Sequence, residues 1–136
     1  MIFIRNKDVY IGKSSIEGYG VFAGSKINNN DIIQECPFIV VNKSYEPVSD
    51  VVFTLNRASN INEFPHMENK NGLVLGIGSM FNTALKPEGM SAEWVIRPEL
   101  NCVEYFATRD IEAGEEILLF YGSDWLERRK VDKNFI

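Results

Sequence analysis

The sequence contains few of the residues that bind structural metals or cross-link secreted domains. Its 136 residues include two cysteines, Cys36 and Cys102, and one histidine, His66. Neither cysteine belongs to a CxxC pair, so the chain lacks the ligand spacing of a structural zinc site. We therefore predict no metal site and expect both cysteines to be buried free thiols.

Long apolar runs are also missing. The longest, such as residues 2–4 and 117–121, are far shorter than the roughly 20 residues of a membrane-spanning helix. The first 15 residues lack the basic region, the apolar stretch and the cleavage site of a signal peptide. These absences predict an intracellular protein without a membrane partner.

A surplus of basic residues is missing as well. The chain has 14 Lys and Arg against 19 Asp and Glu, which gives a net charge of −5. This balance argues against direct nucleic-acid binding, which needs clustered basic residues to contact phosphates. It is compatible with a basic polypeptide partner. Apolar residues make up 45% of the sequence, as in ordinary globular proteins, and the length suits one domain.

Short β-prone segments between turns predict a mostly β domain. Residues 26–31 are crowded with Asn and Asp and predict a tight turn. Residues 32–41 are rich in β-branched side chains, and Pro37 should divide them into two short strands.

The second half of the chain is less regular. Residues 51–58 fit either a strand or a short helix, because their periodicity does not decide between the two. Residues 60–72 are polar and predict an exposed excursion, and residues 92–96 and 101–111 predict a hairpin. The segment after Gly122 has the capping and basic residues of a short C-terminal helix.

Three stretches in this order resemble the SET domain, the fold of many protein lysine methyltransferases. They are SSIEGYGVFAGSKINNNDIIQE (residues 14–35), LGIGSMFN (75–82) and FATRDIEAGEEILLFYG (106–122). The first is similar to the family's GxG opening, and the second to its apolar run that ends in asparagine. The third is similar to the A-x-R-D-I-x-x-G-E-E stretch that leads to the family's tyrosine. The resemblance is closest to the minimal SET proteins of large viruses and some bacteria, which lack cysteine-rich zinc segments.

This resemblance implies both a fold and an activity. The expected fold is a single minimal SET domain over residues 1–136. It is a mostly β clip of short strands and small sheets, with a knot-like C-terminal crossing and a short C-terminal helix. The expected activity is methyl transfer from S-adenosylmethionine (SAM) to the side-chain amine of lysine in a protein. The substrate would be a basic protein or peptide, such as a histone tail. The resemblance also suggests a homodimer, located in the cytoplasm of a bacterium or in the host nucleus for a virus.

Tyr121 matches the tyrosine that the family places at the inner end of a narrow lysine channel. Methyl transfer from a sulfonium requires an aligned, uncharged amine, and a free lysine has a pKa near ~10.4. An apolar, aromatic channel favours the uncharged amine, whose remaining hydrogen a phenol oxygen can orient. The resemblance therefore implies that Tyr121 is the catalytic residue.

The cofactor site follows from the same resemblance. Asn82 matches the asparagine that holds the amino-acid end of SAM, and residues 18–20 match the cofactor-binding turn, where glycine permits close backbone approach. The sequence departs from the family next, because Thr83 and Ala84 stand where histidine and serine are usual. The implied cofactor-binding residues are Gly18, Tyr19, Gly20, Phe81, Asn82 and Thr83.

Three aromatic residues are candidates for the walls of the lysine channel. Trp94 follows the asparagine motif, Trp125 lies four residues beyond Tyr121, and Phe53 is a weaker counterpart of another channel tyrosine. Packing in the core is the alternative for each of them. Glu115 and Glu116 are adjacent, so on a strand they would point to opposite faces and would not share a substrate.

Two other functions remain open on the sequence alone. The departure at Thr83 and Ala84 is compatible with a non-catalytic SET-like module that binds SAM or a basic protein partner. A β-rich structural protein without a ligand is the third alternative. Binding of SAM would separate this third alternative from the other two, because a ligand raises the melting temperature of the protein that binds it.

Overall fold

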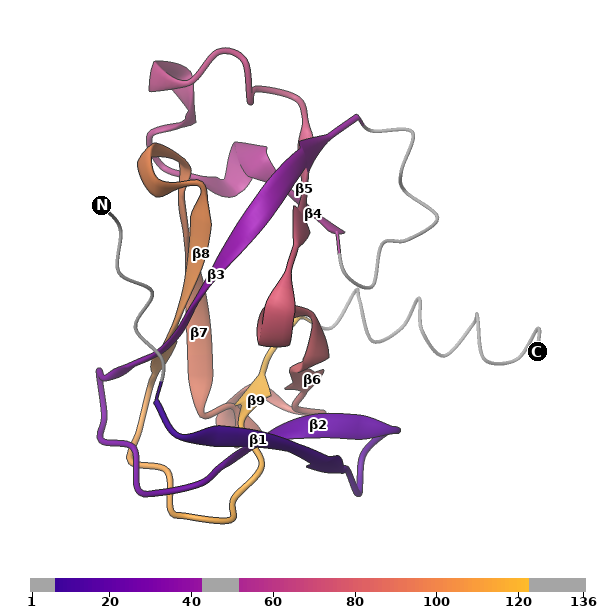
Figure 1. Ribbon diagram of the computed structural model, residues 1–136, viewed down its shortest axis with the longest axis vertical. Helices are drawn as coiled ribbons and strands as arrows, with labels where there is room; N and C mark the ends of the chain where they lie inside the picture. Colours follow the sequence, from indigo (N-terminus) through magenta and orange to yellow (C-terminus); the bar gives the residue numbers. More distant parts are fainter. Residues whose placement is uncertain (1–6, 43–51, 123–136) are drawn as a thin grey trace, which may run out of the picture.

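The computed structural model describes residues 7–42 and 52–122, which form short strands joined by turns and single-turn 3₁₀ helices (Figure 1). The mostly β fold predicted from the sequence is confirmed. The strands are β1 (Val9–Lys13), β2 (Tyr19–Ala23), β3 (Ile32–Val41), β4 (Val52–Thr54), β5 (Asn71–Val74), β6 (Asn82–Thr83), β7 (Ala92–Arg97), β8 (Cys102–Ala107) and β9 (Leu118–Leu119). The 3₁₀ helices are η2 (Leu55–Arg57), η3 (Ile61–Glu63), η4 (Gly76–Met80), η5 (Pro87–Gly89) and η6 (Pro98–Leu100).

These strands build three small sheets within the described residues. The largest has the strand order β4-β5-β3-β8-β7 and is antiparallel throughout. The β1–β2 hairpin runs across the lower end of this sheet in Figure 1. The third sheet is a parallel pair of the two-residue strands β6 and β9. In the described part of the chain, no helix has the length and apolar character needed to cross a bilayer.

The predicted break at Pro37 is wrong, because β3 continues through it as one ten-residue strand. β3 pairs with β8 from Ile32 to Pro37 and with β5 from Phe38 onward. Leu75 donates its N–H to the Pro37 carbonyl at 2.9 Å, just beyond the end of β5. An N–H on residue 37 would point to the same side of the strand as this carbonyl, beyond the end of β5. The strand therefore changes partner at the one residue of β3 that has no backbone N–H to donate.

The segments at residues 51–58 and 60–72 form short strands and 3₁₀ helices. Residues 51–58 contain both predicted elements, since β4 is followed directly by η2. Residues 60–70 are exposed or partly exposed apart from the buried Met67, but Asn71 and Gly72 are buried on β5, so the predicted excursion ends at Lys70. The predicted hairpin is present as β7 and β8, although β8 ends at Ala107. The predicted C-terminal helix lies outside the described residues.

One hydrophobic core joins the β1–β2 hairpin, the large sheet and the segment that leads to β9. The largest fully buried aliphatic side chains are Val21, Ile27, Ile33, Leu55, Val103, Ile111, Ile117 and Leu119. Because these side chains come from all three sheets and the turns between them, the sheets cannot shift independently without opening the core.

Both cysteines are buried free thiols, as predicted. They lie on opposite faces of the sheet, because Cys36 is aligned with Val103 and Cys102 with Pro37 on adjacent strands. Burial raises the pKa of the Cys102 thiol to about 11 and also raises that of Cys36. Neither thiol is therefore a nucleophile at neutral pH.

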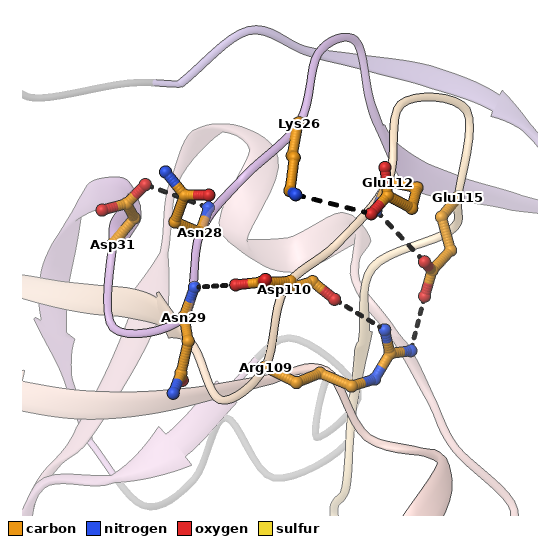
Figure 2. Close-up of polar contacts among 8 residues, drawn as sticks. All are labelled: Lys26, Asn28, Asn29, Asp31, Arg109, Asp110, Glu112 and Glu115. Atoms are coloured by element: carbon orange, nitrogen blue, oxygen red, sulfur yellow. Dashed lines mark hydrogen bonds and ion pairs between the residues drawn. The ribbon is translucent and has the colours of Figure 1, made fainter.

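The turn at residues 26–31 is present and is fastened to the segment that leads to β9. Ile27 and Ile111 exchange backbone hydrogen bonds of 2.8 and 2.9 Å, and both side chains are fully buried. Figure 2 shows the polar contacts around this bridge. Asn29 donates its N–H to an Asp110 carboxylate oxygen at 2.8 Å, and Arg109 forms an ion pair with Glu115. The bridge fixes the C-terminal segment against the connection between β2 and β3.

The Arg109–Glu115 pair should make stability depend on pH. The Arg109 guanidinium holds the pKa of Glu115 below its ordinary value. The pair therefore contributes stability above the unfolded-state pKa of about 4.3, and this contribution is lost as pH falls through the folded-state pKa. We expect Arg109→Gln to lower the free energy of unfolding in urea by roughly 0.2–1 kcal/mol at pH 7, since the pair is partly exposed.

Most of that deficit should disappear at an acidic pH below the folded-state pKa of Glu115, where the carboxyl is protonated in both states. Lys26→Gln is the matched control, because Lys26 reaches Glu112 only at 3.9 Å and is more exposed. An Arg109→Gln deficit of equal size at both pH values would contradict the assignment.

Candidate active site

The β1–β2 turn forms one side of the site. Ser14 donates its N–H to the Gly18 carbonyl at 2.8 Å, and Gly18 has a positive φ of 49° that favours glycine. Gly20 is buried, and a Cβ at this position would collide with the Glu116 carboxylate and lie 3.0 Å from Nδ2 of Asn82. Glycine is therefore required at position 20 because the backbone there lies close to these two side chains. Tyr19 is 61% exposed.

Asn82 lies on β6 and its side-chain amide faces this turn. Its Nδ2 donates toward the carbonyl oxygens of Glu17 at 3.1 Å and Tyr19 at 3.2 Å. A third acceptor, Oε2 of Glu116, lies 3.0 Å from the same nitrogen. The structure thus brings the predicted cofactor residue Asn82 to Tyr19 and Gly20, which lie over 60 residues earlier in the sequence.

Thr83 connects β6 to the predicted catalytic residue. Its hydroxyl accepts the backbone N–H of Tyr121 at 3.1 Å and donates to the Ala84 carbonyl at 3.0 Å. The Thr83 side chain is buried. The threonine that replaces the usual histidine therefore acts inside the protein, where it holds the backbone of Tyr121.

Tyr121 follows β9 and is half-buried beside β6 and β7. Its hydroxyl donates to the Phe81 carbonyl at 3.5 Å, which is longer than the roughly 2.5–3.0 Å of a good O–H···O bond. The ring of Trp94 packs on it at a centroid distance of 5.5 Å and an interplanar angle of 47°. Two predicted residues, Tyr121 and Trp94, thus form one aromatic wall.

Phe81 contributes its backbone to this wall and its side chain to the core. Its ring is buried against Tyr105, with a centroid distance of 4.7 Å. Tyr105, on β8 opposite Trp94, donates its hydroxyl to the Gly78 carbonyl at 3.3 Å. Burial raises the pKa of Tyr105, as does the nearby Tyr121, so the phenol stays protonated. Sequence reasoning missed Tyr105, which looks like any strand residue.

Among the described residues, the channel candidate Phe53 is not part of this wall. The ring of Phe53, on β4, packs edge-on against Phe38 at 5.8 Å and covers Gly72 on β5. Its contacts are those of a sheet residue, in line with the core-packing alternative. Trp125 lies outside the described residues. Sequence reasoning also missed Ser14, whose hydroxyl donates to Glu116 at 2.8 Å.

The turn and the Asn82 amide fit the amino-acid end of a nucleoside cofactor. A Cβ at Gly18 would meet nothing within 4 Å, so the turn is open on that side. Among the described residues, no hydrogen bond reaches Oδ1 of Asn82, while Nδ2 is committed to the protein. An acceptor beside an open glycine turn suits the ammonium group of an amino acid. Within residues 7–42 and 52–122 there is no group of three or more metal-ligating side chains.

The comparison with protein-family models agrees with this geometry. The model of the SET domain matches residues 18–122, which run from the glycine turn to the residue after Tyr121. The chain belongs to the SET-domain family. A SET domain therefore spans nearly the whole described part of the chain. Gly18, Asn82 and Tyr121 all lie inside it.

Relatives of this SET domain include a histone methyltransferase. The chain is 32% identical over 115 residues to a Schizosaccharomyces pombe histone-lysine N-methyltransferase specific for H3 lysine-37, covering 82% of this chain and 71% of that protein. A crystal structure of a Plasmodium falciparum candidate histone methyltransferase matches with a TM-score of 0.65 and 28% identity, covering 90% of this chain and 99% of that one.

A more distant structure shares the fold. A humanized mutant of the Chaetomium thermophilum Polycomb Repressive Complex 2, bound to the inhibitor GSK126, matches with a TM-score of 0.62 and 23% identity. The match covers 87% of this chain and 15% of the other chain. The SET fold expected from the sequence is therefore confirmed.

The role of Thr83 can be tested by removing its hydroxyl. We expect Thr83→Val to lower the free energy of unfolding by about 1–3 kcal/mol, because the Tyr121 N–H loses its acceptor in a partly buried site. Thr83→Ser keeps the hydroxyl and should retain most of the stability. Urea denaturation of both variants provides the measurement, and equal stability of Thr83→Val and wild type would show that the bond contributes nothing.

Proposed function

We propose that this SET domain is a SAM-dependent protein-lysine N-methyltransferase. One observation carries the proposal: the pairing of β6 with β9 brings both sequence neighbours of Asn82 into contact with Tyr121. An amide suited to a cofactor and a phenol suited to an amine thus occur at one site. Membership of the family and the name of the S. pombe relative support the reaction.

The cofactor would be held by the turn and by β6. Gly18, Tyr19 and Gly20 would line the bound nucleoside, and Oδ1 of Asn82 would accept from its ammonium group. When bound, SAM supplies an activated methyl group on a positively charged sulfur. Phe81 and Thr83 would act chiefly through β6, because their side chains are buried in the protein.

Tyr121 would orient the lysine amine. The rings of Trp94 and Tyr121 offer an apolar surface that strips water from an incoming amine, and desolvation lowers an amine pKa. The tyrosine hydroxyl can accept an amine N–H in place of a water, which leaves the nitrogen lone pair to react. The hydroxyl can keep donating to the Phe81 carbonyl at the same time, because donation uses its hydrogen and acceptance uses a lone pair.

A basic polypeptide such as a histone tail is the proposed substrate. The chain carries 19 acidic against 14 basic residues, so its field attracts basic segments. The S. pombe relative is described as specific for a histone lysine, which supports this class of substrate. An intracellular location suits it and remains a prediction, as does a homodimer, which light scattering would distinguish from a monomer.

One observation keeps a second function in view. Thr83 and Ala84 replace residues that are usual in catalytic SET domains, and the chain could instead be a non-catalytic module that binds SAM or a basic partner. The hydrogen bond from Tyr121 to Thr83 favours the enzyme, because it holds the catalytic candidate in place without the usual histidine.

Tyr121→Phe tests the enzyme directly. We expect methyl transfer to fall by about 10²-fold or more, because the ring stays but nothing orients the amine. Affinity for S-adenosylhomocysteine should change by less than about threefold, since Tyr121 faces the amine rather than the cofactor's amino-acid end. Labelled SAM with recombinant histone H3 and mass spectrometry would measure transfer, and calorimetry would measure binding.

Tyr10→Phe is the matched control. Tyr10 lies on β1, is 47% exposed and stacks on Phe22, so its hydroxyl should not affect transfer. Tight binding of S-adenosylhomocysteine by a wild-type protein that transfers no methyl group would favour the non-catalytic module. Unchanged transfer by Tyr121→Phe would contradict the assigned role of this residue.

A further inference from the structure

Two adjacent glutamates reach opposite sides of the C-terminal segment. Glu115 forms its ion pair with Arg109 on the outer side, at the turn shown in Figure 2. Glu116 instead points into the site, where it contacts Ser14 and Asn82. The sequence prediction that the two carboxylates do not share a substrate is in line with this arrangement, which also supplies a matched pair of residues for experiment.

Glu116 links three elements of the cofactor site through its carboxylate and its backbone. Its Oε1 accepts the Ser14 hydroxyl at 2.8 Å, and its Oε2 lies 3.0 Å from Nδ2 of Asn82. The backbone of Glu116 also forms a bridge with Phe22 on β2. The side chain of Glu116 therefore connects the turn after β1 with β6, and its backbone adds a link to β2.

Ser14 extends this network into the glycine turn. Its Oγ accepts the backbone N–H of Ile16 at 2.9 Å while its hydroxyl hydrogen goes to Glu116. A hydroxyl that donates in one direction and accepts from the other is fixed in orientation. The turn at residues 14–18 is thus fastened to Glu116 before any ligand arrives.

The same network sets the orientation of the Asn82 amide. Nδ2 has two hydrogens, and three protein oxygens lie within 3.2 Å of it. All of them are acceptors, so the nitrogen end of the amide must face the protein. Oδ1 then remains as the one end of the amide that a ligand can use, and it accepts hydrogen bonds only.

We propose that Glu116 is a positioning residue that keeps Asn82 in this orientation, so that the site selects a ligand group that donates hydrogen bonds. The proposal rests on the proposed function, in which that group is the ammonium of SAM. The negative charge of Glu116 strengthens the hydrogen bond from Nδ2, because bonds to a charged acceptor are stronger than those to a neutral one.

Glu116→Gln should release the amide. A glutamine at this position has one acceptor and one donor end, whereas Ser14 and Asn82 both present donors to it. If its NH₂ group faces Asn82, two donors oppose each other and only the carbonyls of Glu17 and Tyr19 still hold Nδ2, so rotation of the amide that presents Nδ2 to the ligand is favoured. A donor would then meet the ammonium group, and binding of the amino-acid end would weaken.

The test compares two nucleosides that differ in the amino-acid end. S-adenosylhomocysteine carries this end and methylthioadenosine lacks it. We expect Glu116→Gln to weaken S-adenosylhomocysteine by about tenfold, as for the loss of one charge-assisted hydrogen bond, and to change methylthioadenosine by less than about twofold. Glu115→Gln should leave both affinities at the wild-type value.

A second variant and a spectroscopic measurement guard against unfolding of Glu116→Gln. Ser14→Ala removes one donor to Glu116 and leaves the apolar core unchanged, and it should weaken only S-adenosylhomocysteine, by a smaller factor. In ¹⁵N-labelled protein without ligand, the side-chain amide signals of Asn82 should shift in Glu116→Gln and stay in place in Glu115→Gln.

The outcomes separate this inference from the proposed function. Equal weakening of both nucleosides by Glu116→Gln, or unchanged affinity for both, would overturn the positioning role while the wild-type affinity upholds the cofactor site. Unchanged amide signals of Asn82 would overturn it as well. A wild-type protein that binds neither nucleoside would remove the proposed function and the positioning role that rests on it.

Discussion

The parallel pairing of β6 with β9 is the contact on which the site depends. It joins Asn82 to Leu118 and Thr83 to Leu119, and the Ala84 N–H extends it with a 2.6 Å bond to the Leu119 carbonyl. On its other side, β9 is held by Ser91, which exchanges two hydrogen bonds with Leu118. The C-terminal segment thus passes between β6 and the start of β7. A two-residue pair is weak alone, but here the buried Ile117 and Leu119 side chains hold it.

Two side-chain hydrogen bonds then fix the site residues beside this strand pair. Thr83 holds the backbone of Tyr121, and Glu116 holds Asn82 against the glycine turn. The first contact satisfies a backbone N–H just beyond the short strand β9, and the second satisfies a side-chain amide. The pairing of β6 with β9 therefore positions both the Asn82 amide and the Tyr121 phenol. Glu116 holds the amide, and Thr83 holds the backbone of Tyr121.

Local patterns in the sequence were enough for the family, the mostly β fold and the hairpin of β7 and β8. The motifs also marked Asn82 and Tyr121, since each ends a recognisable stretch. Pairing across distance was not predictable in the same way. The continuity of β3 through Pro37 depends on where β5 ends, and the partners of Glu116 depend on Ser14, which carries no pattern of its own. Phe53 matched a channel position in sequence, yet its ring packs within the large sheet.

The most direct test of this account is a crystal structure of the protein with S-adenosylhomocysteine. The account predicts that the ammonium group of the ligand donates a hydrogen bond to Oδ1 of Asn82. It also predicts that the sulfur of the ligand faces the Tyr121 hydroxyl beside the ring of Trp94. A nucleoside bound away from β6, or a sulfur shielded from Tyr121 by the protein, would contradict it.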